Sequence, residues 1–277
     1  MAGAERADLV VVGAGPIGGW ASVFARQDGA GRVVVLEAGL AGQGASSRAA
    51  GIVRSQGGIP ATVALGRWSV DFFNRQADRY GTDSGFRELG YILLALTDDE
   101  ERDARERIAM QRAGGLDVRW VSAAEAMRLN PTLSLAGFRG GSYCPPDGCI
   151  DPPRNVRAYS LAMQVAGAEL REGTAFTGLR TEAVPGGGRR VVGVETSAGP
   201  IATERVVLTG GPQLHEVGRL AGIRIPTGPV RHTVAVTERH EAFDVERLPM
   251  AYDVGRGMYW RLEEGGLVFG WSAPGEA

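Results

Sequence analysis

The N-terminal region contains the pattern that most restricts the fold of this chain. Residues 9–12 and 33–36 are short runs of valine and leucine, which suit parallel strands that are buried on both faces. Between them, Gly13, Gly15 and Gly18 give the spacing G-x-G-x-x-G at the start of an expected helix. A strand, a glycine-rich turn, a helix and a second strand together predict a β-α-β unit.

This unit is typical of a dinucleotide-binding site. The first glycine permits a tight turn, the second lets a pyrophosphate approach the backbone, and the third lets the helix pack closely on the strand. Pro16 suits the first helical turn, whose free N–H groups attract phosphates. Glu37 ends the second strand, where its carboxylate can accept hydrogen bonds from ribose hydroxyls and disfavours a 2′-phosphate. These residues do not distinguish NAD from FAD.

Length and composition favour a soluble enzyme with more than one domain. The chain has 277 residues, of which 44% are hydrophobic and 22% are charged. Its net charge of −2 gives no electrostatic reason to bind nucleic acid or an anionic membrane. No apolar stretch is long enough for membrane insertion, and the first strand begins too early to leave room for a signal peptide. We therefore expect a cytoplasmic protein.

The sequence has no lysine, so all 30 of its basic residues are arginines, and Schiff-base chemistry within the chain is excluded. Cys144 and Cys149 flank the turn sequence Pro-Pro-Asp-Gly. Too few ligands lie near them for zinc, so no metal site is expected. Two reduced thiols are the expected state, with a redox-active pair as the alternative.

The remaining chain alternates between helices and strands. Helices are expected over residues 60–80, 97–114, 122–130 and 151–167, three of them with N-terminal capping residues. A strand at 91–96, a parallel strand at 168–172 and a β-meander over 174–184, 191–196 and 201–208 are expected as well. Gly210 and Gly211 make a second junction from strand to glycine to helix. After Pro226, runs at 230–237, 258–262 and 267–271 predict an antiparallel sheet.

Several segments, in this order, resemble one family of flavoproteins. They are VVVGAGPIGG, VVVLEAG, GASSRAAGIVR, GYILLALTDDE, YCPPDGCIDP, RVVLTGGPQ, IPTGPVRHTVAVTE and GMYWRLEEGGLVFG. The chain resembles the D-amino acid oxidase superfamily, and most closely its sarcosine oxidase and dimethylglycine dehydrogenase-like branch. The resemblance implies an α/β fold with an FAD-binding Rossmann-like domain of the glutathione reductase type and a second, antiparallel-sheet substrate domain. The expected boundaries are 1–85 and 150–225 for the first domain, and 86–149 and 226–277 for the second.

The resemblance also implies roles for individual residues. The residues expected to bind FAD are Gly13, Gly15, Pro16, Gly18, Glu37, Ala38, Ser46, Ser47, Arg48, Phe176, Gly210 and Gly211. Arg54 falls where related enzymes hold the substrate carboxylate, a task that suits a planar, two-pronged guanidinium, although a structural salt bridge is the alternative. Tyr259, Trp260 and Ser272 match positions near the substrate pocket.

The implied reaction is oxidation of an amine, such as a secondary or N-methyl amino acid, to an imine by hydride transfer to flavin N5. No catalytic base is assigned. The candidate partners are this small-molecule amine, an electron acceptor and a partner chain. The rival hypotheses are an NAD-dependent dehydrogenase and a non-catalytic or partner-dependent nucleotide-binding fragment.

Three departures from the family pattern shape these expectations. The family continues with a segment that covers the flavin ring, so a truncated or partner-completed form is expected. Val268 stands where sarcosine oxidases place a lysine near flavin N5, which favours a dehydrogenase over an oxidase. No histidine precedes His215, so FAD is expected to bind non-covalently.

Overall fold

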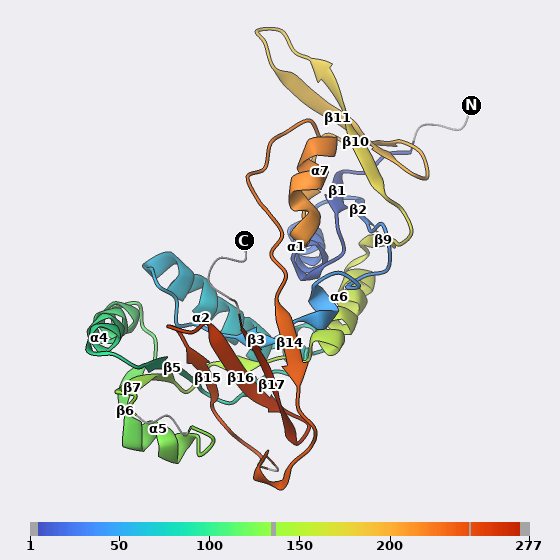
Figure 1. Ribbon diagram of the computed structural model, residues 1–277. Helices are drawn as coiled ribbons and strands as arrows, with labels where there is room; N and C mark the ends of the chain where they lie inside the picture. The colour runs from blue at the N-terminus through green and yellow to red at the C-terminus, as the bar shows by residue number, and fades with distance from the viewer. Residues whose placement is uncertain (1–4, 134–136, 244, 272–277) are drawn as a thin grey trace.

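The computed structural model describes residues 5–133, 137–243 and 245–271. A four-stranded parallel sheet forms one end of the molecule, in the order β13 (Val206–Leu208), β1 (Leu9–Val12), β2 (Val33–Leu36) and β9 (Glu169–Arg171) (Figure 1). All four residues of β2 are buried, as a central parallel strand requires. The expected β-α-β unit and the parallel strand at 168–172 are therefore confirmed.

Helices cover one face of this sheet. α1 (Pro16–Gln27) packs against α6 (Pro152–Ala166), and their shared core includes Trp20, Val23, Tyr159 and Met163. α2 (Pro60–Asn74) and α3 (Gln76–Tyr80) add Phe72 and Tyr80 to the same cluster. α6 begins where Asp151 accepts a hydrogen bond from the N–H of Arg154 at 2.9 Å, as its sequence predicts.

The other face carries a β-meander and one helix. β10 (Phe176–Ala183), β11 (Arg189–Thr196) and β12 (Ile201–Ala202) form an antiparallel sheet, and the β10–β11 hairpin extends away from the body of the molecule (Figure 1). η2 (Gly211–Gln213) and α7 (Leu214–Leu220) follow β13. Side chains of Leu179, Val217 and Leu220 pack on the cluster beneath β1 and β2.

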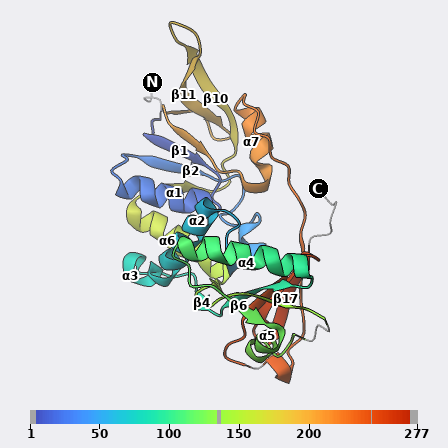
Figure 2. The same ribbon diagram turned by 90° about the vertical axis from the view of Figure 1, so that its left-hand side faces the viewer.

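A seven-stranded sheet forms the other end of the molecule, as Figure 2 shows from the side. Its order is β14 (Thr233–Val236), β17 (Gly266–Trp271), β16 (Met258–Glu263), β15 (Met250–Asp253), β5 (Tyr91–Ala95), β7 (Gly140–Cys144) and β6 (Arg119–Ser122). α4 (Asp98–Ala113) and α5 (Ala123–Leu129) connect its strands, and η3 (Glu241–Phe243) follows β14. The Thr97–Glu100 capping box at the start of α4 is confirmed.

This sheet is larger than the antiparallel sheet predicted from the runs at 230–237, 258–262 and 267–271, because β6, β7 and β15 were not predicted. One of its pairings is parallel: β15 pairs with β5, so that Met250 lies opposite Tyr91. The other neighbouring strands of the sheet are antiparallel. The parallel pair is possible because the long chain between β5 and β15 passes through the first sheet before it returns.

A small fourth sheet joins segments from both predicted domains. It consists of β3 (Ile52–Val53), β8 (Gly148–Cys149) and β4 (Arg87–Glu88), with β8 in the centre. η1 (Ser46–Arg48) lies on the chain that leads from β2 to β3. The strands of the two larger sheets fall within the two predicted sets of ranges, although the domain boundaries themselves stay a prediction. Among the described helices, none has the length and hydropathy that a bilayer crossing requires.

Candidate active site

The glycine-rich turn after β1 leaves no room for side chains. Gly13 has a φ of +103°, and a Cβ there would lie 2.6 Å from the carbonyl oxygen of Thr209. A Cβ on Gly18 would lie 2.0 Å from the carbonyl oxygen of Gly13. Both glycines are therefore required for the close packing of α1 against the turn and against the end of β13.

Thr209 completes this turn, and sequence reasoning did not single it out. Its hydroxyl is 2.8 Å from the carbonyl oxygen of Val12 and 2.9 Å from that of Gly13, and donates to them. Gly210 and Gly211 follow at once, so the structure brings this second glycine junction to the first one. The position of Thr209 directly after a predicted strand was the available signal.

The N-terminus of α1 forms a cradle for an anion. Gly15 is its N-cap, no side chain caps it, and Pro16 occupies the first turn. Ser46 in η1 lies beside Gly15, because a Cβ on that glycine would be 3.3 Å from the serine Oγ. Uncapped N–H groups at a helix N-terminus, next to a hydroxyl and a glycine that leaves space, fit a pyrophosphate.

The carboxylate of Glu37 turns back toward the glycine-rich turn. Its Oε2 accepts a hydrogen bond from the N–H of Ala14 at 3.0 Å, and its Oε1 accepts one from Gly39 at 2.9 Å. Ala38 lies exposed between them. On the far side, the Tyr159 hydroxyl donates to the carbonyl oxygen of Ala14 at 2.9 Å. Burial, and then the charge of Glu37, raise the pKa of Tyr159, so its hydroxyl stays a donor at neutral pH.

The other residues expected at the cofactor lie in different environments. Ser47 is fixed by a 3.1 Å hydrogen bond from its N–H to the carbonyl oxygen of Gly42, and Arg48 is exposed at the end of η1. Phe176 begins β10 with its ring buried beneath β1 and β2. Its backbone alone is therefore free to face a ligand.

A second site lies on the seven-stranded sheet, next to the chain that follows η1. It is a cavity of about 380 Å³, lined by Ala49, Ala50, Gly51, Ile52, Arg54, Tyr91, His232, Tyr252, Gly257 and Tyr259. The structure thus brings together Arg54 and Tyr259, which the sequence suggested. Tyr91, Tyr252 and His232 were not anticipated.

The register of the sheet explains why the tyrosines meet. Tyr252 of β15 lies opposite Tyr259 of β16 in an antiparallel pair, which puts both side chains on one face. Tyr252 also lies opposite Leu93 of β5, two residues from Tyr91, so Tyr91 shares that face. The pairing of β5 with β15 is therefore what assembles the wall of the cavity.

Trp260 does not line this cavity. Side chains alternate along a strand, and Trp260 packs on the opposite face with Ile92 and Ala251. Its assignment to the substrate pocket gains no support from this geometry. Ser272 lies outside the described residues, so its assignment stays a prediction.

The ionisation states in the cavity favour an anionic ligand. Burial raises the pKa of Tyr91, with Arg54 acting in the opposite direction, and burial also raises the pKa of Tyr259. Both phenols are therefore neutral donors or acceptors at neutral pH. Arg54 adds a permanent positive charge with up to five N–H donors. The combination suits a carboxylate attached to a small apolar group.

A larger cavity of about 590 Å³ lies near β4 and β8, and two of the three arginines that line it are already paired. Arg154 forms a salt bridge with Asp83 at 2.7 Å, and Arg261 is paired with Glu263. With those charges neutralised, this cavity is a weaker candidate than the one at Arg54.

Comparison with known proteins identifies a family and several relatives. Residues 8–276 match the family model described as FAD dependent oxidoreductase. Mitochondrial sarcosine dehydrogenase of Mus musculus is 28% identical over 96% of this chain, and glycine oxidase of Geobacillus kaustophilus is 30% identical over 82% of it. This chain spans 29% and 60%, respectively, of the length of those two proteins.

Solved structures agree with these relatives. The crystal structure of L-proline dehydrogenase from P. horikoshii superimposes with a TM-score of 0.87 at 25% identity, over 99% of this chain and 72% of that one. The crystal structure of glycine oxidase from Geobacillus kaustophilus gives a TM-score of 0.81 at 28% identity, over 97% of this chain and 71% of that one.

Proposed function

Because this chain belongs to the family of FAD-dependent oxidoreductases, we propose that it oxidises a secondary or N-methyl amino acid to an imine. When bound, FAD supplies the acceptor for a hydride at flavin N5. The substrate loses that hydride from the carbon next to nitrogen and a proton from nitrogen, and water then hydrolyses the imine. The observation that carries the proposal is the cavity that joins Arg54 to three tyrosines beside the loop that leads from η1.

The cofactor would be held by the turn after β1. We assign the pyrophosphate to the uncapped N–H groups of α1, to Gly15 and to Ser46, because these leave space and donors for an anion. Glu37 would accept hydrogen bonds from a ribose while its two backbone donors keep it in place. We also propose that FAD is bound without a covalent link, since no histidine precedes His215.

Arg54 would bind the substrate carboxylate through paired N–H donors. Tyr91, Tyr252 and Tyr259 would surround the carbon chain, exclude water and orient the C–H bond. The positive charge of Arg54 disfavours a second cation nearby, which favours the neutral amine that hydride loss requires. No side-chain base is assigned.

We favour a dehydrogenase over an oxidase. The chain contains no lysine, and Val268, at the position where sarcosine oxidases carry one, is buried in β17 opposite Arg261 and Val236. An acceptor other than oxygen would then regenerate the cofactor. The cytoplasmic location stays a prediction, as do the electron acceptor and any partner chain.

The alternative of a partner-dependent nucleotide-binding fragment has one observation in its favour. The chain spans only 29% of the length of its sarcosine dehydrogenase relative, so a second chain or segment could be needed for turnover. A nicotinamide enzyme is disfavoured, because the family match extends across both sheets rather than over the β-α-β unit alone.

A visible absorption spectrum of the purified chain tests the proposal. Bound flavin should give its two characteristic bands, and acid precipitation should release all of the colour. Sarcosine or proline added without oxygen should bleach the longer-wavelength band. A protein that binds FAD but is not bleached would support the partner-dependent alternative, and a chain that takes up no FAD would overturn the proposal.

A further inference from the structure

A buried carboxylate lies behind the Arg54 cavity. Asp147 is 0% exposed in the turn between β7 and β8. Its carboxylate accepts hydrogen bonds from the N–H of Ser55 at 2.7 Å, from the Ser55 hydroxyl, and from Nε2 of Gln56 at 3.3 Å. The two residues that follow Arg54 are thus both attached to this one carboxylate.

The main chain of Asp147 holds the other wall of the cavity. Its carbonyl oxygen accepts hydrogen bonds from the N–H groups of Leu89 at 3.2 Å and Gly90 at 2.8 Å, directly before Tyr91. The amide of Gln56 also donates to the carbonyl oxygen of Tyr91 at 3.0 Å. Asp147 therefore connects the segment that carries Arg54 to the segment that carries Tyr91.

The direction of Arg54 depends on the residue after it. Ser55 is 1% exposed and its side chain is held inward by Asp147, whereas Arg54 is exposed toward the cavity. The N–H of Ser55 belongs to the peptide group that joins Ser55 to Arg54, and it donates to Asp147 at 2.7 Å. Holding Ser55 on Asp147 therefore fixes the main chain from which the Arg54 side chain extends into the cavity.

This network is not an ion pair. The groups that donate to the Asp147 carboxylate are neutral, and burial raises the pKa of that carboxyl. The Cys144 sulfur lies 3.5 Å from the Ser55 hydroxyl, and burial, followed by the charge of Asp147, raises the pKa of that thiol, so it stays protonated. A buried carboxyl without a cationic partner is costly. What Asp147 does in the structure is hold together the segments of Ser55 and of Gly90 through its hydrogen bonds.

We infer that Asp147 is a positioning residue, which fixes the Arg54 guanidinium through Ser55 and so sets the affinity for a substrate carboxylate. The inference rests on the proposed function. Guanidinium and carboxylate pair well only in a narrow geometry, so a small displacement of Arg54 weakens binding of a carboxylate while leaving the rest of the site unchanged.

The test compares two matched serine variants and one aspartate variant. Ser55→Ala removes the hydroxyl bound to Asp147. Ser84→Ala is the control, because Ser84 is 0% exposed and its hydroxyl donates to Oδ1 of Asn155 at 2.9 Å, away from the cavity. Asp147→Asn keeps the shape of the side chain but gives it a donor that faces the Gln56 amide.

Each protein is assayed with sarcosine and proline, and with their counterparts without a carboxylate, dimethylamine and pyrrolidine. The Kd of methoxyacetate, measured by calorimetry, reports carboxylate binding without turnover, since an uncharged ether oxygen replaces the nitrogen that an imine requires. Ser55→Ala and Asp147→Asn should raise the KM for the amino acids and the Kd of methoxyacetate by about tenfold. Values of kcat/KM for the two amines and all values of Ser84→Ala should match the parent protein.

Two results would overturn the inference. One is Ser55→Ala with the parent KM for sarcosine and proline, and the other is an equal loss of activity toward amino acids and simple amines. If the parent protein neither oxidises the amino acids nor binds methoxyacetate, the proposed function fails and this inference fails with it. If Asp147→Asn does not fold, the comparison of Ser55→Ala with Ser84→Ala still shows whether the contact between Ser55 and Asp147 sets the KM for the amino acids.

Discussion

The Nε–H of Arg261 donates to the main-chain carbonyl oxygen of Ala50, so a buried side chain of β16 holds the loop that precedes Arg54. The same guanidinium contacts the carbonyl oxygen of Leu262 and the carboxylate of Glu263. A side chain of the seven-stranded sheet therefore holds in place the chain that leads from η1 to Arg54.

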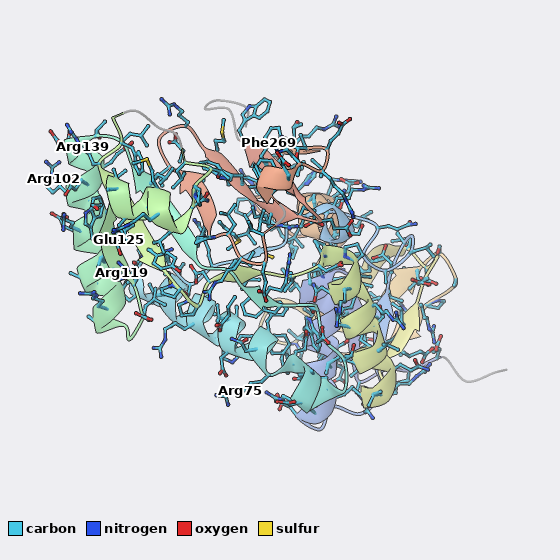
Figure 3. The ribbon with its side chains drawn as sticks, turned by 90° about the horizontal axis from the view of Figure 1, so that it is seen from below. Arg75, Arg102, Arg119, Glu125, Arg139 and Phe269 are labelled. Carbon is cyan, nitrogen blue, oxygen red and sulfur yellow. The ribbon has the colours of Figure 1, made fainter. Side chains whose placement is uncertain are left out.

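Replacing this guanidinium should destabilise the protein. Arg261→Met leaves the Ala50 carbonyl oxygen without its donor, and the expected loss is about 1–3 kcal/mol of unfolding free energy. Urea unfolding followed by circular dichroism measures it. Arg75→Met is the control, because Arg75 and Asp71 are 74% and 56% exposed, and Figure 3 shows Arg75 at the edge of the molecule. Equal losses in the two variants would refute the role of Arg261.

Arg54→Lys should weaken substrate binding more than it slows the chemical step. Lysine keeps the charge but cannot offer two coplanar donors, so the KM for the amino acid substrate should rise by about tenfold or more. Steady-state kinetics with sarcosine or proline give this value. Arg139, labelled in Figure 3, forms an exposed ion pair with Asp98, and Arg139→Lys should leave KM unaltered. An unchanged KM in Arg54→Lys would exclude Arg54 from carboxylate binding.

Gly15→Ala should separate cofactor binding from folding. The new methyl group would lie 3.3 Å from the Ser46 Oγ, in the space assigned to the pyrophosphate, while the backbone φ of −78° accepts alanine. FAD affinity should fall by about tenfold or more, because the phosphate loses its close approach. Fluorescence titration of the FAD-free protein measures this. Gly228→Ala, where a Cβ meets open space, should bind FAD as the parent does.

Glu5 should contribute to stability at moderate pH and lose that contribution in acid. Its hydrogen bond with Arg171 lowers the pKa of Glu5 from 4.5 to about 2, despite burial, and Arg32 contributes in the same direction. A lowered folded-state pKa stabilises above the unfolded value, and the gain disappears as the pH falls from 4.5 to about 2. Melting temperatures of Glu5→Gln should therefore fall less steeply across this range.

Added salt provides a second test of the ion pairs that Glu5 forms with Arg32 and Arg171. The Arg32–Glu5 contact of 2.6 Å is partly exposed, so added salt should reduce the difference between Glu5→Gln and the parent. Glu182→Gln, which loses only an exposed contact of 3.6 Å with Arg190, should keep the parent's pH dependence. If the melting temperature of Glu5→Gln falls with pH as steeply as that of the parent, Glu5 does not make the predicted contribution to stability.

Cys144 and Cys149 should resist alkylation in the native protein. Both are buried, which shields them from the reagent, and they are not bonded to one another. Burial also raises the pKa of the Cys144 thiol, so little Cys144 thiolate forms at neutral pH. Mass spectrometry after iodoacetamide treatment should find no adduct before denaturation and two after it. Rapid labelling of the native protein would revive the redox alternative for this pair.

Much of the fold could be predicted from the sequence because the patterns that specify it lie within a few consecutive residues. Gly13, Gly18 and the valine-rich runs around them specify the β-α-β unit within a few residues, and Thr97 with Glu100 specifies a helix start. Long-range pairing leaves no such signal. β15 is only four residues long, and it forms a strand because it pairs with β5, where Met250 lies opposite Tyr91, far earlier in the chain.

The candidate site shows the same limit. Arg54 and Tyr259 were found from sequence, but Tyr91 and Tyr252 reach the cavity only through the β5–β15 pairing. Trp260 was grouped with its neighbour Tyr259, although alternation along a strand already places adjacent side chains on opposite faces. Asp147 could be identified from the sequence as a turn residue, but its hydrogen bonds to Ser55 join distant parts of the chain and are seen only in the structure.

The parallel pairing of β5 with β15 also has a consequence for the order of events during synthesis. Tyr91 leaves the ribosome well before Met250, so the open edge of β5 must wait for its partner while the strands of the other sheet are made. Contacts between residues so distant in sequence form slowly. The cavity takes residues from both β5 and β15, so the proposed substrate site is among the last parts of the molecule to be assembled.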